Sequence, residues 1–167
     1  NVEEFVNVGA FGTVQLADGA VNTVVSTTAG STTVAGTATA GTWTTLADIV
    51  FSPGEPARCE FSYSISWSGV TPSSAVDYGS AYARVGVEVR LKTYLSGTLL
   101  SDVAINDVDD LLYIGLNSSR NSAISSSAVF DAEAGKTHHV VVLGQRYTAS
   151  GSTVVNNLQA TLGIRKK

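Results

Sequence analysis

Several residue types are scarce in this chain, and each scarcity narrows what the protein can be. Its 167 residues include one cysteine and no methionine, and charged residues make up only 14%. The lone Cys59 cannot form an internal disulfide, so the fold must be stable without covalent cross-links. The net charge of −4 leaves no basic surface for phosphate backbones. We therefore expect neither nucleic acid nor an anionic membrane as a partner.

Long apolar runs are also missing. No stretch approaches the roughly 18 to 20 apolar residues of a membrane span, and the first residues lack the basic-then-apolar order of a signal peptide. We expect no membrane insertion. The absence of methionine indicates a processed product or a piece of a longer polypeptide. The last predicted strand runs almost to the final residues, Lys166 and Lys167, which favours a C-terminal piece.

The first forty residues differ in composition from the rest. The stretch "VNTVVSTTAGSTTVAGTATAGT", residues 21–42, is almost wholly Val, Thr, Ala, Ser and Gly. These residues favour extended backbone but supply few large side chains for a core. We interpret residues 1–41 as an extended arm that packs along its own domain or around a neighbouring subunit, with a flexible linker as the alternative. Residues 42–167 then form one head domain.

The head domain shows a period of two, which is typical of strands with one buried face. In "RCEFSYSISWSG", residues 58–69, every second residue is apolar. The same pattern recurs in residues 83–91 and 158–164, and turn signals separate the strands at "SPGEP", "LSGT" and Gly135. Many short strands with few helical signals predict an all-β antiparallel sandwich or barrel.

One segment, "LLSDVAINDVDDLLYIGL" at residues 99–116, is ambiguous because its apolar residues also fit a helical face. We favour two strands around a turn at "NDVDD", Asn106 to Asp110. These oxygen-bearing side chains could hold calcium, but the stretch lacks the central glycine and closing glutamate of a calcium loop. A polar turn is the preferred interpretation, and we expect no metal.

No catalytic template fits the chain. There is no GxSxG motif and no phosphate-cradling glycine loop, and no particular pair of carboxylates is marked for glycoside hydrolysis. His138 and His139 are adjacent, so a strand would point them to opposite faces, one packed and one exposed. With one cysteine, zinc ligands are too few. We predict a protein that is not an enzyme and has no cofactor.

Two loops have the composition of a binding surface, in which rigid aromatic residues and small polar residues occur together. The first spans residues 66–81, and the second, a polar loop or weak edge strand, spans residues 117–127. The alternatives are that Trp67 belongs to the core and that the second loop is merely solvated. The candidate receptor-binding residues are Trp67, Asp77, Tyr78, Tyr82, Asn117, Arg120 and Asn121.

Two parts of the sequence resemble a known family. "VQLADGAVNTVVS", residues 14–26, resembles a segment of bacteriophage central tail-tip and tail-fibre proteins. The stretches "GTWTTLADIVFS", "DAEAGKTHHVVVLG" and "VVNNLQATLGIRK" resemble, in their order, the C-terminal jelly-roll heads of phage fibres and, more distantly, the trimeric jelly rolls of the C1q and tumour-necrosis-factor type. The chain lacks the aromatic-rich signature of the C1q group. The resemblance implies a homotrimeric jelly roll with contacts in the loops at one end.

The leading hypothesis is a non-catalytic receptor-binding tip domain of a phage tail fibre. It would be extracellular, as part of the virion, and would adhere to a glycan or protein on the bacterial surface through three weak sites acting together. One alternative is a structural virion protein, such as a capsid decoration or tail assembly module. The other is a bacterial lectin-like carbohydrate-binding domain.

Overall fold

The computed structural model contains strands throughout the part of the chain that it describes. The described residues are 7–9, 13–15, 22–29, 31–35, 43–71, 76–77, 80–115, 118–146 and 152–167. Among them, no helix is long and apolar enough to cross a membrane. The strands are β1 (Asn7–Gly9), β2 (Thr13–Gln15), β3 (Asn22–Ala29), β4 (Thr32–Ala35), β5 (Thr44–Ser52), β6 (Ala57–Val70), β7 (Val76–Asp77), β8 (Ser80–Leu95), β9 (Thr98–Gly115), β10 (Arg120–Ala132), β11 (Thr137–Arg146) and β12 (Ser152–Lys166).

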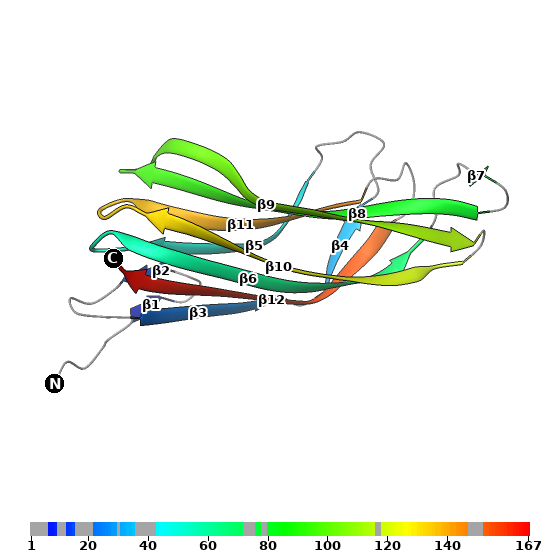
Figure 1. The fold of residues 1–167 in the computed structure, drawn as a ribbon, viewed down its shortest axis with the longest axis horizontal. Coiled ribbons are helices and arrows are strands. Elements are labelled where there is room, and N and C mark those ends of the chain that lie inside the picture. Colours follow the sequence, from blue (N-terminus) through cyan, green and yellow to red (C-terminus); the bar gives the residue numbers. More distant parts are fainter. Residues whose placement is uncertain are drawn as a thin grey trace.

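The strands form two sheets that pack face to face (Figure 1). One sheet has the order β1-β2-β5-β11-β8-β7, with β9 also paired to β8. The other has the order β10-β6-β12-β3, with β4 also paired to β12. Pairing is antiparallel except between β2 and β5. The predicted all-β sandwich is therefore confirmed.

The strand pairs are nested, which identifies the topology. β3 pairs with β12, β5 with β11, β6 with β10 and β8 with β9, as in one long hairpin whose tip is the β8–β9 turn. Rolling that hairpin up brings β8 beside β11 and β6 beside β12, and both pairings are present. This rolled hairpin is a jelly roll, as the resemblance to fibre heads implied.

The predicted alternation of apolar and polar residues along the strands decides which side chains form the core. On β6 the side chains of Cys59, Phe61, Tyr63, Ile65 and Trp67 are all buried, while their neighbours face outward. The inward residues of β8 and β12 complete the same cluster between the sheets. Burying one such aliphatic or aromatic side chain contributes about 1.5–3 kcal/mol, so this apolar layer is the main source of stability.

The predicted turns are also confirmed. Ser96 and Gly97, with φ of 48° and 82°, form the two-residue turn between β8 and β9, where both central residues need positive φ. Gly135, with φ of 72°, lies in the turn between β10 and β11. Its N–H donates a hydrogen bond of 3.2 Å to the carbonyl of Pro53 and joins this turn to the β5–β6 turn.

The prediction of two strands around a turn at Asn106–Asp110 is wrong. β9 runs without a break from Thr98 to Gly115 and pairs along the whole of β8, with register shifts at two points. The polar residues fit a strand because two of them point between the sheets and bond to other strands. Tyr63 donates a hydrogen bond of 3.1 Å to Asn106, and Asn106 donates one of 2.9 Å to Ser126 on β10. The hydroxyl of Ser122 donates to Asp110 in the same way.

The described parts of the N-terminal forty residues belong to the sandwich. β3 and β4 both pair with β12, and Val25 and Val34 are buried in the core. These strands therefore pack along the chain's own domain. The division between arm and head at residue 42 stays a prediction.

Candidate interaction surface

The outer face of the β10-β6-β12-β3 sheet carries rows of short polar side chains. This pattern arises because the outward positions of β6 from residue 62 onward are serines, and the outward positions of the neighbouring strands match them in register. One row across the sheet consists of Ser127, Ser62, Thr161 and Ser26, and the next of Ser125, Ser64, Gln159 and Thr28. The hydroxyls of Ser26 and Thr161 lie 3.4 Å apart. We call this the hydroxyl face.

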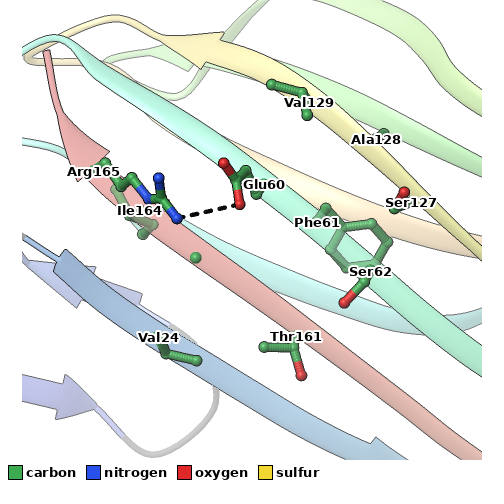
Figure 2. Close-up of a pocket in the computed structure, with 11 residues that line it drawn as sticks. Val24, Glu60, Phe61, Ser62, Ser127, Ala128, Val129, Thr161, Ile164 and Arg165 are labelled. Atoms are coloured by element: carbon green, nitrogen blue, oxygen red, sulfur yellow. Dashed lines mark ion pairs between the residues drawn. The ribbon is translucent and has the colours of Figure 1, made fainter.

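One end of the hydroxyl face is hollowed into a groove of about 510 Å³ (Figure 2). Val129 on β10 and Val24 on β3 stand at its two sides, 54% and 65% exposed. Between them in the same row are Glu60 and Gly163. Arg165 forms an ion pair of 3.5 Å with Glu60. The groove therefore combines exposed apolar side chains with a charge that is already paired.

A shallower depression continues along the sheet from this groove. It measures about 460 Å³ and shares Ser62, Ser127 and Thr161 with the groove lining. Its described lining residues are serines, a threonine, Gln159 and Tyr63, and none of them is charged. This surface can form hydrogen bonds with a partner without stripping water from an ion.

The outer face of the other sheet is different, because charged residues crowd its β8 and β9 strands. Arg90 bonds to the carboxylates of Glu88 at 2.6 Å and Asp102 at 2.7 Å, and Lys92 lies 3.7 Å from Asp102. Hydrogen bonds to Glu88 and Asp102 raise the pKa of Arg90 above its ordinary value. Removing water from charged groups is costly, and the central rows of the hydroxyl face carry fewer charges than β8 and β9, so we take the hydroxyl face as the candidate contact surface.

The two histidines point to opposite faces of β11, as predicted. His138 is buried, stacks on Phe51 at 5.3 Å between ring centroids, and lies 3.1 Å from both the Thr93 hydroxyl and the Glu133 carbonyl. Burial lowers its pKa. Nδ1 of His139 lies 3.1 Å from both carboxylate oxygens of Asp48 on the outer face. Among the described residues, no group of three or more His, Cys, Asp or Glu is placed to hold a metal ion.

Three of the predicted receptor-binding residues have described side chains. Trp67 is 0% exposed and lies in the core, which is the alternative that the sequence left open for this residue. Arg120 is exposed, and its Nη1 donates a hydrogen bond of 3.0 Å to the carbonyl of Tyr113. The side-chain oxygen of Asn121 accepts one of 3.3 Å from the N–H of Gly69. Arg120 and Asn121 thus hold the backbone of neighbouring strands at one end of the sandwich.

The structure describes only the backbone positions of two further candidates, and these lie at the same end of the sandwich as Arg120. Asp77 lies in β7 and Tyr82 in β8, where Tyr82 is opposite Tyr113 on β9. Tyr78 and Asn117 lie outside the described residues. That these residues bind a receptor stays a prediction.

Sequence reasoning did not select the hydroxyl face as a site. Its signal was present in the alternating serines of β6, at Ser62, Ser64 and Ser66, which predicted a side facing water or a neighbouring sheet. Only the register of β3, β10 and β12 shows that the hydroxyl rows run across all four strands.

Comparison with known proteins identifies no family for this chain. No family model matches the chain, and no curated protein matches it. Among solved structures, the infectious bursal disease virus Gx strain matches with a TM-score of 0.33 and 11% identity over 91% of this chain. The VP2 subviral particle of infectious bursal disease virus matches with a TM-score of 0.33 and 11% identity over 97% of it.

This chain spans less than half of the length of those two structures, 42% and 45% respectively. At such TM-scores the similarity carries no argument about this chain. The assignment of this chain to the jelly-roll fold rests on its own nested strand pairs.

Proposed function

We propose that this chain is a non-catalytic structural domain of a virion that assembles as a homotrimer through its hydroxyl face. The observation that carries the proposal is the contrast between the two outer faces of the sandwich. On one face, Glu88, Arg90, Lys92 and Asp102 gather on β8 and β9. On the other face, charged residues are confined to one end, where Arg58 pairs with Asp131 and Arg165 with Glu60, and the central rows beside the groove carry hydroxyls. The virion setting and the threefold symmetry rest on the sequence resemblance to phage fibre heads.

The physical case for association depends on what would be buried. Covering Val24 and Val129, which are largely exposed, would contribute on the order of 2 kcal/mol each. The serine and threonine hydroxyls can donate and accept, so they can form hydrogen bonds with polar groups on the surface that a neighbouring copy presents. Except where Glu60 and Arg165 already pair, the central rows carry no charge whose desolvation would oppose the contact.

The alternative is attachment to a bacterial surface through the loops at the end of the sandwich. Arg120 and Asn121 already bond to Tyr113 and Gly69 within the chain, and Trp67 is buried. These observations favour the structural role. A receptor-binding function remains compatible with a trimer, since three weak sites gain affinity by acting together.

The proposal is tested by measuring the solution mass of the chain by light scattering over a wide concentration range. Ser62, exposed at the centre of the hydroxyl face, is replaced by lysine. Thr45, an exposed residue on β5 in the other sheet, receives the same change as the matched control. We expect the wild type and Thr45→Lys to have three times the chain mass and Ser62→Lys to be monomeric, because a lysine would be buried there without a partner.

Two results would contradict the proposal. A wild type that is monomeric at every concentration would exclude assembly through any face. A Ser62→Lys variant that stays trimeric would place the contact elsewhere. Circular dichroism of each variant establishes that the sandwich is intact.

A further inference from the structure

One hairpin projects from the sandwich with both of its sides uncovered. A strand that covers a core buries every second side chain, and β8 does so as far as Thr93. Beyond that point the alternation stops, because every residue from Leu95 to Ala104 is exposed. Figure 1 shows the β8–β9 hairpin standing apart at the end of the sandwich where the C-terminus lies. The described part of the chain thus leaves both sides of this hairpin tip to solvent or to a partner.

The hairpin tip is apolar and nearly uncharged. Its large apolar side chains, each 47–49% exposed, are Leu95, Leu99, Leu100 and Val103. Asp102 is the only charged residue between Leu95 and Ala104, and it already pairs with Arg90 at 2.7 Å. Exposed apolar side chains gathered in this way mark a contact surface.

The groove at the end of the hydroxyl face contains a glycine that the fold itself does not require. Gly163 lies inside β12, in the row between Glu60 and Val24, where it offers no side chain. Its φ is not positive, and β12 keeps its register with both neighbouring strands at this point. A Cβ would meet only the carbonyl oxygen of Glu60, at 3.7 Å, which is an ordinary contact. Backbone geometry and packing within the described part of the chain would therefore accept a larger residue.

A glycine inside a strand weakens that strand, and it often marks a place where a ligand or another backbone comes close. Beside Gly163, the exposed side chains of Val24 and Val129 stand at the two sides of the groove (Figure 2). The charged groups of the lining, Glu60 and Arg165, already pair with each other at 3.5 Å. The groove therefore fits an apolar, uncharged segment of chain.

We infer that the tip of the β8–β9 hairpin of a second copy of this chain occupies the groove beside Gly163. The inference rests on the proposed self-assembly and names the segment that is inserted. Hairpin and groove match, since both present exposed leucine or valine and both have their charges already paired. The turn at Ser96 and Gly97 fixes the shape of the hairpin before binding, so little conformational entropy is lost.

The position of the two surfaces requires a contact between copies. The hairpin extends one sheet, whereas the groove lies on the outer face of the other sheet, so a chain cannot place its own hairpin there. A contact between two different patches closes into a ring when its rotation is suitable, and a ring of three copies is the proposed trimer.

The inference is tested first by filling the groove. Gly163→Val adds a β-branched side chain that suits a strand and has room, so the sandwich should fold as before. We expect this variant to be monomeric by light scattering at concentrations where the wild type is trimeric. Replacing Leu99 and Leu100 by serine should weaken assembly from the other side, by about tenfold or more for each leucine. Leu111→Ser, at an exposed leucine nearer the other end of β9, is the matched control and should stay trimeric.

Cross-linking then identifies the two surfaces. A variant with both Leu100→Cys and Val129→Cys, treated with a short bis-maleimide, should give covalent trimers on a denaturing gel. Each single variant should give no cross-link, because equivalent positions on different copies lie apart in such a ring. The wild type controls for Cys59, which is buried.

The outcomes separate this inference from the proposed assembly. A wild type that is trimeric together with a trimeric Gly163→Val variant, or with a double cysteine variant that does not cross-link, would overturn the inference and leave the trimer standing. Cross-linking of Leu100→Cys alone would mean that hairpins meet each other and would also overturn it. A wild type that is monomeric at every concentration would overturn the proposed assembly as well.

Discussion

Replacing Asn106 by alanine tests whether the polar centre of β9 joins the two sheets. The side chain accepts a hydrogen bond of 3.1 Å from Tyr63, and donates bonds of 2.9 Å to the Ser126 hydroxyl and 3.3 Å to the Ser127 carbonyl. At about 0.5–1.5 kcal/mol for each bond, its removal should lower the free energy of unfolding by about 2–4 kcal/mol.

The assay is urea denaturation followed by tryptophan fluorescence, with Asp107→Ala as the control. Asp107 is the next residue, is exposed, and points to the other face, so its replacement should change the free energy of unfolding by less than about 0.5 kcal/mol. A double-mutant cycle with Tyr63→Phe should show a coupling of about 1 kcal/mol, because each variant removes the same bond. Equal, small effects of both single replacements would mean that residues 106–110 form a solvated turn.

Two further predictions concern buried groups. Burial lowers the pKa of His138 in the folded chain, so the unfolded chain binds a proton there more readily. The folded state should therefore keep its stability above the unfolded pKa of about 6.5 and lose stability as the pH falls below that value. Melting temperatures across this range should fall less steeply for His138→Gln, and an identical slope would refute the assignment. Burial, followed by the charge of Asp131, raises the pKa of Cys59 to about 12, so a thiol reagent at neutral pH should modify it only at the rate of unfolding. Rapid modification of the native protein would contradict the burial of this thiol.

Much of the fold could be predicted from local pattern. The period of two on β6, β8 and β12 decides which side chains are buried whatever the neighbouring strands are. Glycine at residues 97 and 135 marks turns because both positions need positive φ. Each of these signals is contained in a few consecutive residues, so it can be recognised from the sequence alone.

The wrong prediction at β9 shows a limit of structure prediction from local sequence pattern. The pattern of Asn106 to Asp110 predicts a turn because Asn and Asp are depleted in strands and favoured in turns. Their inward positions are tolerated because Tyr63, Ser122 and Ser126, on other strands, supply hydrogen bonds. No property of residues 106–110 alone reveals those partners.

For the candidate surfaces, too, the sequence determined some features and the tertiary structure determined others. The sequence by itself determined that β6 has a serine side and an apolar side, that His138 and His139 face apart, and that the fold is an all-β antiparallel sandwich or barrel. Only the tertiary structure decided that four strands align their hydroxyls into one face, and that the tip of the β8–β9 hairpin is exposed on both of its sides. The physical reason is that alternation is fixed by the geometry of a single strand, whereas register, burial and partners depend on strands far apart in the chain.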